Sequence, residues 1–150
     1  MDPAGVEDDA PETDASDRRS GVGIEDQTPT ELAQTLLVAC RRDEATEPYT
    51  DALAAATEDD LAAVREDRAT ALAFWLNCYN AGTQLLLDER PELYDSPLRF
   101  LRFFRAPAIE VGNTSLPLDR IENGILRGGL SKYGLGYVPK LLTTEFERAY

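Results

Sequence analysis

The segment from residue 69 to residue 88 constrains the fold of this chain more than any other. It is apolar on nearly every side at helical spacing and contains FWLNCYN at residues 74–80. Asp67 precedes it where a helix cap is expected, and Pro91 follows it where a helix cannot continue. A helix that is apolar nearly all round is normally buried in a larger core. The pattern therefore predicts one central, buried helix against which the rest of the chain packs.

Neutral amides interrupt this apolar helix along one line. At about 100° per residue, Asn77, Asn80 and Gln84 fall within a narrow stripe that Asp88 continues. Elsewhere the chain builds its polar helix faces from Asp, Glu and Arg. An amide makes directed hydrogen bonds without carrying charge into a low-dielectric site. We therefore expect partly buried, hydrogen-bonded amides that pin a neighbouring segment or line a ligand pocket. The alternative is a thin stripe that faces solvent.

Shorter helices are predicted on both sides of the central one. Capping boxes at Thr28 and Thr57 start two of them, and residues 49–56 have the spacing of a third. After the central helix, Ser96–Pro97 starts a further helix that combines leucine and phenylalanine with arginine.

Residues 108–116 have the pattern of a small β-hairpin, because Gly112–Asn113 lies between two short alternating runs. The sequence that follows predicts a helix with Ser115 as its cap and Gly128–Gly129 at its end. The expected fold class is therefore α+β, mainly α-helical, with a central helix at about 69–88, several shorter helices and one hairpin.

The chain divides into a tail and one domain. Residues 1–27 are rich in Asp, Glu, Pro, Gly and Ser and hold almost no large apolar side chains. Ordering such a segment gains too little burial to offset its loss of entropy. We expect a disordered acidic tail over 1–27 and a single domain over 28–150, which is long enough to bury one core.

The charge of the chain limits its partners. The net charge is −13, from 28 Asp and Glu against 15 Lys and Arg. Nucleic acids and anionic membrane surfaces are therefore not expected to bind. Only Lys132 and Lys140 are lysines. Many acids, few lysines and abundant alanine favour a halophilic source, since salt screens the repulsion among carboxylates; the alternative is an ordinary acidic protein.

The residues that most enzymes use for proton transfer and covalent catalysis are scarce. The chain has no histidine, and its two cysteines, Cys40 and Cys78, form no CxxC pair. Histidine-dependent catalysis within this chain is excluded, and we expect no metal site and no cofactor. Neither a signal-peptide pattern nor an apolar stretch of about 18 residues is present, so we expect a cytoplasmic protein without a membrane span.

Two stretches resemble signatures of the domain of unknown function 547 family. ALAFWLNCYNAGTQLLL at residues 71–87 is similar to its F-W-[IL]-N-x-Y-N-A motif. SLPLDRIENGILRGG at residues 115–129 resembles its second motif, Leu-Asp-x-Ile-Glu-[HN]-x-Ile-Leu-Arg. The resemblance covers roughly residues 30–150.

The resemblance implies no particular activity, because none is established for the family as a whole. Members normally carry a third, cysteine-containing motif, which has suggested a papain-like or transglutaminase-like thiol enzyme. This chain ends at Tyr150 before such a motif, and it has Asn123 where many members have histidine. The resemblance therefore implies the N-terminal portion of such a domain, truncated at its C-terminus.

Three functional hypotheses follow. We expect a binding or structural module without self-contained catalysis, because the stripe consists of amides and thiol–histidine chemistry is absent. The alternative is part of a hydrolase or transferase of the thiol-enzyme type whose nucleophile motif lies beyond Tyr150. A third interpretation is a regulatory module with the acidic tail as its contact region.

The candidate polar pocket combines the amide stripe with two carboxylates of the second motif: Asn77, Asn80, Gln84, Glu122 and Asp119. Asp119 and Glu122 are three residues apart on one helix face, where they form an acid–base pair, a cation site or a solvated surface. Glu122 within hydrogen-bonding reach of Asn77 or Asn80 in a cleft would support the pocket. Glu122 paired only with a neighbouring arginine would not.

The partner is unknown. A truncated domain leaves apolar surface uncovered, which we expect around Phe103, Tyr137 and Val138. Such a surface would bind a protein partner or another copy of the chain.

Overall fold

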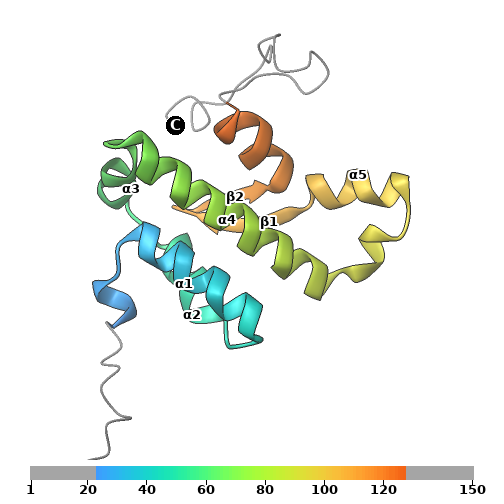
Figure 1. Cartoon of the computed structure of the whole chain (residues 1–150), viewed down its shortest axis with the longest axis horizontal. Helices are drawn as coiled ribbons and strands as arrows, with labels where there is room; N and C mark the ends of the chain where they lie inside the picture. The colour runs from blue at the N-terminus through green and yellow to red at the C-terminus, as the bar shows by residue number, and fades with distance from the viewer. Residues whose placement is uncertain (1–22, 128–150) are drawn as a thin grey trace, which may run out of the picture.

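The computed structural model describes residues 23–127, which form a helical structure with one small antiparallel sheet (Figure 1). In chain order the elements are η1 (Ile24–Asp26), α1 (Pro29–Arg42), α2 (Glu47–Ala54), α3 (Glu58–Arg65), α4 (Arg68–Glu89), η2 (Pro91–Tyr94), α5 (Pro97–Arg105), β1 (Pro107–Val111), β2 (Thr114–Pro117) and η3 (Arg120–Leu126). The predicted fold class is confirmed: the described chain is mainly α-helical α+β with a long central helix and one hairpin.

Helices α1, α3, α4 and α5 begin where a polar side chain accepts a hydrogen bond from a backbone amide of the first turn. Thr28 and Glu31 form the predicted capping box of α1, in which Thr28 N donates to Glu31 Oε2 at 2.8 Å. Thr57 and Asp60 form the same arrangement at α3. The Asp67 carboxylate accepts a backbone amide in the first turn of α4 at 2.8 Å. Because these caps join residues only three apart, the sequence alone indicates where the helices start.

Helix α4 lies at the centre of the molecule. It contacts α1, α3, β1, η2 and η3, and Figure 1 shows α1 on one side of it and η3 on the other. Its buried side consists of Phe74, Trp75, Cys78, Ala81, Gly82 and Leu86. The opposite side faces solvent, with Leu72 47% and Leu76 42% exposed. The central position is as predicted, but α4 is buried on one side rather than all round.

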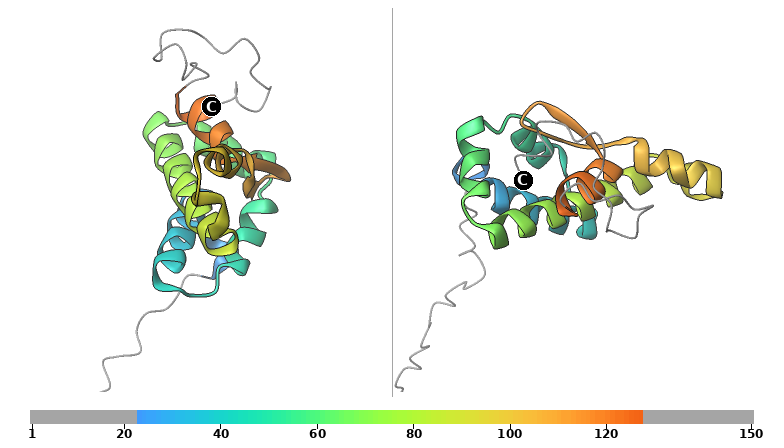
Figure 2. Two further views of the ribbon diagram at one scale, coloured as in Figure 1. Left: turned by 90° about the vertical axis from the view of Figure 1, so that its right-hand side faces the viewer. Right: turned by 90° about the horizontal axis from the view of Figure 1, so that it is seen from above.

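A smaller core lies where α5 meets the end of α4, and Figure 2 shows α5 projecting at one end of the molecule. It consists of the buried side chains Leu86, Leu93, Phe103 and Leu118. Phe103 itself is 2% exposed, so it packs in this core and is not part of the uncovered apolar surface that the sequence predicts around it. Leu98, Phe100 and Leu101 of the same helix are 79%, 39% and 48% exposed. Tyr137 and Val138, the other members of that predicted surface, lie outside the described residues.

The hairpin forms as predicted, with β1 and β2 antiparallel around the Gly112–Asn113 turn. Both turn residues have positive φ, 55° and 58°, as two-residue turns of type I′ require. The turn is tied to the end of α2, because Gly112 N donates to Leu53 O at 3.0 Å and Asn113 N donates to Ala54 O at 2.8 Å. The hairpin therefore has a fixed place against the helices, and its last strand leads directly into η3.

The segment after the hairpin differs from the predicted helix. Ser115 lies in β2 opposite Glu110, so it pairs across the hairpin instead of capping a helix. The following turn is a π-helix, in which Arg127 N donates to Glu122 O, five residues back, at 3.0 Å. The predicted end at Gly128–Gly129 lies outside the described residues.

The described chain starts within the predicted acidic tail. Residues 24–26 form η1, and Ile24 packs against the main core. Residues 1–22, and with them most of the predicted tail, lie outside the described part, as do residues 128–150. None of the helices within residues 23–127 is long and apolar enough to cross a bilayer.

Replacing Gly112 by alanine is expected to destabilise the protein by about 1–3 kcal/mol, because L residues are strained at positive φ. The added Cβ would also lie 2.8 Å from Leu61 Cδ1. Urea denaturation followed by circular dichroism measures the loss. Asn113→Gly is the matched control, since glycine adopts the φ of 58° without strain. Equal losses for the two variants would contradict the strain argument.

Candidate functional site

A polar connection between α4 and η3 passes through Glu122. The Tyr79 hydroxyl of α4 donates to Glu122 Oε2 at 3.3 Å, and Arg127 Nη2 lies 3.2 Å from Glu122 Oε1. Burial raises the pKa of Tyr79, and the charge and hydrogen bond of Glu122 raise it further, while Arg127 opposes the shift. The carboxylate is thus held between a phenol and a guanidinium.

The second polar group of η3 is Asn123, which is 5% exposed. Its Nδ2 donates to Asp119 Oδ1 at 2.9 Å. An ionised carboxylate only accepts, so this contact fixes which end of the amide faces Asp119. The other end, Oδ1, is buried and has no hydrogen-bond partner among the described residues. A buried acceptor left in this state costs about 1–3 kcal/mol.

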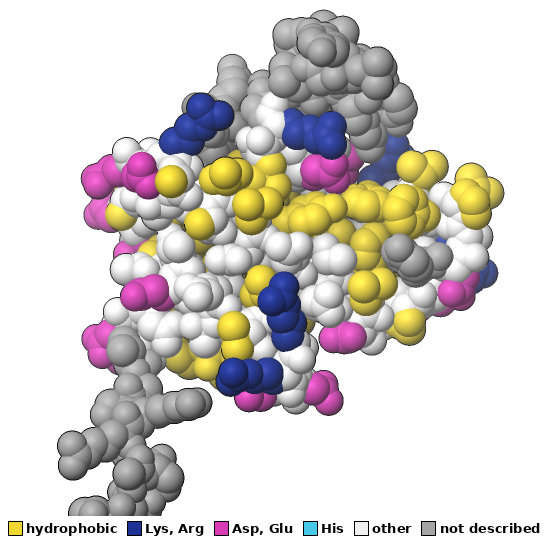
Figure 3. Space-filling view, viewed as in Figure 1, with side chains coloured by type: hydrophobic (Ala, Val, Ile, Leu, Met, Phe, Trp, Pro, Cys, Tyr) yellow, Lys and Arg dark blue, Asp and Glu magenta, His cyan; other side chains and the backbone are white. Residues whose placement is uncertain are grey.

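A pocket with a volume of about 210 Å³ lies between η3 and α5 at this amide. The η3–α5 pocket is lined by Phe100, Leu101, Phe104, Arg105, Asp119, Glu122 and Asn123. The rings of Phe100 and Phe104 pack edge to face with centroids 4.8 Å apart. Figure 3 shows a band of hydrophobic side chains between η3 and α5, bordered by acidic and basic side chains. The η3–α5 pocket therefore combines an aromatic wall with two carboxylates and the side chain of Asn123.

The charges around the η3–α5 pocket are arranged unevenly. Asp119 and Glu122 approach it from η3, next to the buried amide. Arg127 pairs with Glu122, and Arg105 is exposed at the edge of the pocket. Solvent screens the exposed Arg105 more than the half-buried carboxylates. The inner end of the pocket is thus rich in acceptors, which suits a ligand with hydrogen-bond donors.

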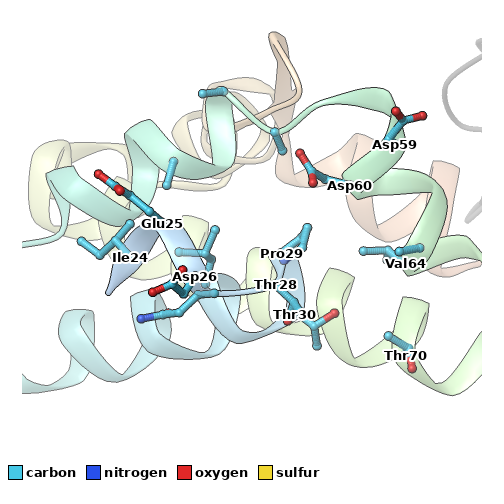
Figure 4. Close-up of a pocket in the computed structure, with 16 residues that line it drawn as sticks. Ile24, Glu25, Asp26, Thr28, Pro29, Thr30, Asp59, Asp60, Val64 and Thr70 are labelled. Carbon is cyan, nitrogen blue, oxygen red and sulfur yellow. The ribbon is translucent and has the colours of Figure 1, made fainter. Parts of the chain in front are cut away.

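A larger cavity, of about 610 Å³, lies between η1, α1, α2, α3 and the start of α4 (Figure 4). Its carboxylates come from η1 on one side, Glu25 and Asp26, and from α3 on the other, Asp59 and Asp60. Asp60 is already used as a helix cap. Among the described residues, no group of three or more His, Cys, Asp or Glu side chains is placed to hold a metal ion. This cavity contains no buried polar group that calls for a ligand.

A family model described as "protein of unknown function, DUF547" matches residues 64–147. The chain belongs to the DUF547 family. No curated protein and no solved structure matched the chain. The matched region contains α4, α5, the hairpin and η3. All of the residues that line the η3–α5 pocket are therefore within the DUF547 part of the chain.

This DUF547 chain brings together two of the five predicted site residues, because Asp119 and Glu122 both line the η3–α5 pocket. The amides lie elsewhere: Asn80 and Gln84 are exposed, and Asn77 is half-buried. No hydrogen bond within residues 23–127 joins one of these amides to either carboxylate. The partial burial expected for the stripe is found only at Asn77, because α4 packs through the adjacent side that contains Phe74, Cys78 and Ala81.

Sequence reasoning missed the residues that complete the η3–α5 pocket. Asn123 carried a signal that could have been used, since it is a neutral amide between the apolar positions Ile121 and Ile125 of the second DUF547 motif. Tyr79 lies in the first motif and Phe104 in α5. Their contact with η3 depends on how distant segments pack, so nothing in the local sequence indicated it.

The two thiols of this DUF547 chain are poor nucleophiles. Cys78 is fully buried, and burial raises its pKa far above the ordinary thiol value. Burial also raises the pKa of Cys40, and the negative charge of Asp88 adds to the effect. A thiolate is the reactive form, so neither side chain is activated at neutral pH.

Glu122→Gln is expected to lower the pKa of Tyr79, because the charge and the hydrogen bond of the carboxylate both raise it. Burial is the larger cause, so the pKa stays above the ordinary tyrosine value of about 10. Absorbance titration of tyrosinate measures the shift. Each protein is compared with the same protein carrying Tyr79→Phe, and the difference between the two titrations gives the contribution of Tyr79.

Glu89→Gln, at the far end of α4, is the control and should leave the Tyr79 titration unchanged. The raised pKa of Tyr79 also determines how folding stability changes with pH. A phenol whose pKa is higher in the folded state stabilises the fold below pH of about 10, and this stabilisation is lost as the pH rises through the folded value. An unchanged Tyr79 titration in Glu122→Gln would contradict the contact.

Proposed function

We propose that this DUF547 protein is a binding module without self-contained catalysis, and that its ligand donates a hydrogen bond to Asn123 in the η3–α5 pocket. One observation carries the proposal. Asn123 Oδ1 is buried without a described partner, in an amide whose orientation Asp119 fixes. Buried polar groups are almost always satisfied, and an exception in a native structure calls for an explanation, such as a functional role or a bound water or ion. A hydrogen-bond donor supplied by a ligand would satisfy Asn123 Oδ1.

The surroundings of the amide indicate the class of ligand. The carboxylates of Asp119 and Glu122 attract a cation, and the rings of Phe100 and Phe104 favour a cation or an alkyl stem against their faces. A volume of about 210 Å³ suits a small group rather than a whole nucleotide cofactor. The ligand that fits is an ammonium or guanidinium group on a short apolar stem, either as a free small molecule or as a side chain.

The absence of self-contained catalysis is supported by the chemistry of the available groups. The chain has no histidine, and both thiols have raised pKa values. The raised pKa values of Cys40 and Cys78 give no support to either of them as the nucleophile of a thiol-type hydrolase or transferase. Nucleic acid is not a proposed ligand, since the net charge of −13 repels phosphates.

Asn123→Leu tests the proposal, because leucine has nearly the same shape and removes the buried acceptor. Binding of n-butylammonium, followed by chemical shifts of backbone amides around η3, is expected to weaken at least about tenfold, as for the loss of one charge-assisted hydrogen bond. The thermal midpoint of the variant is expected to stay the same or rise, because an unsatisfied polar group is gone.

Two comparisons make the result specific. Asn80→Leu makes the same change at an exposed amide of α4 and should leave binding intact. Butyrate has the same stem with the opposite charge and should not bind in the η3–α5 pocket. Equal responses to n-butylammonium and butyrate, or unchanged binding in Asn123→Leu, would contradict the proposed function.

A further inference from the structure

Helix α5 presents two leucines and two arginines along one exposed face. Leu98, Leu101, Arg102 and Arg105 have the spacing i, i+3, i+4 and i+7, which places them on the same side of the helix. Leu98 is 79% exposed and Leu101 is 48% exposed, and both arginines are exposed as well. The other side of α5 buries Phe103 in the smaller core. We name these four residues the α5 outer face.

A groove of about 350 Å³ continues this face toward η2 and the start of β1. Its floor is apolar, with Leu93, Ala106 and Pro107, and its arginines are Arg90, Arg102 and Arg105. Arg90 pairs with Glu92 at 3.5 Å. Neither Arg102 nor Arg105 has an ion-pair partner within residues 23–127, although acids outnumber bases in the chain by 28 to 15.

We propose that the α5 outer face and this groove dock an acidic amphipathic helix of a partner protein. Leucines of the partner cover Leu98 and Leu101, and its carboxylates pair with Arg102 and Arg105. Contiguous exposed apolar side chains mark protein interaction sites, and arginine is enriched among the residues that contribute most of the binding energy there. Leu101 and Arg105 of this surface also line the η3–α5 pocket, whereas Leu98 and Arg102 do not.

The local positive charge of Arg102 and Arg105, in a molecule that is acidic elsewhere, favours this occupant over others. A net charge of −13 repels extended polyanions and anionic bilayers as a whole. A second copy of the chain carries the same charge and meets the same repulsion. A single helix with a few carboxylates places its charges directly at the arginines, where attraction is strongest, and brings few like charges near the rest of the surface.

The test uses the full chain and a fluorescein-labelled helical peptide with leucine along one face and glutamate beside it. Fluorescence anisotropy is expected to report saturable binding that weakens as salt is added. Arg102→Glu and Leu98→Ser are each expected to weaken binding about tenfold or more, in keeping with anchor residues of small interfaces. Both side chains are exposed and neither lines the η3–α5 pocket, so folding and ligand binding there are retained.

Arg42→Glu is the matched control, because Arg42 is also an exposed arginine in the last turn of a helix, α1. It should leave peptide binding unchanged. A peptide with lysine in place of glutamate should not bind. Equal binding of the two peptides, an equal effect of Arg42→Glu, or no binding at all would overturn the proposal. So would a concentration-dependent dimer, or binding to phosphatidylserine vesicles, that Arg102→Glu abolishes.

Discussion

Burial of one side of α4 is the constraint on which the rest of the structure depends. Phe74, Trp75 and Cys78 are fully buried or nearly so, and burying a large aromatic side chain stabilises the fold by about 2–3 kcal/mol. Helices α1 and α3, strand β1 and η3 all contact this one element. Tyr79 lies next to the buried side and borders both cores. The packing of α4 therefore determines where the Tyr79 hydroxyl contacts the Glu122 carboxylate of η3.

The regular α-helical hydrogen bonding of the chain is replaced by a π-helix at η3, and the candidate site lies there. A π-helix is rare, and it is frequently found at functional sites. In the same few residues Asn123 is buried with an unsatisfied oxygen, while the remainder of η3 buries Ile121 and Ile125 in the main core. Natural chains keep such locally unfavourable features where function compensates for them. An apolar residue at position 123 would serve the core better, so the amide points to a role in binding.

The elements governed by neighbouring residues could be predicted from the sequence. The capping boxes at Thr28 and Thr57 and the turn at Gly112–Asn113 rest on contacts three residues apart or fewer. The features that depend on packing between distant segments could not be predicted from the sequence. The angular pattern of α4 aligned its amides correctly, but it could not say which side meets the core, so Asn80 and Gln84 were expected to be partly buried. Asp119 and Glu122 were predicted, whereas the aromatic wall that faces them comes from α5.

We propose that Asn123 is the ligand-binding centre of the η3–α5 pocket. A crystal structure of the chain with n-butylammonium tests this most directly. The predicted result places the ammonium nitrogen within hydrogen-bonding distance of Asn123 Oδ1, with Nδ2 still donating to Asp119 and the alkyl stem against Phe100 and Phe104. An Asn123 oxygen bonded to another part of the chain or only to water, with the cation elsewhere, would contradict the account.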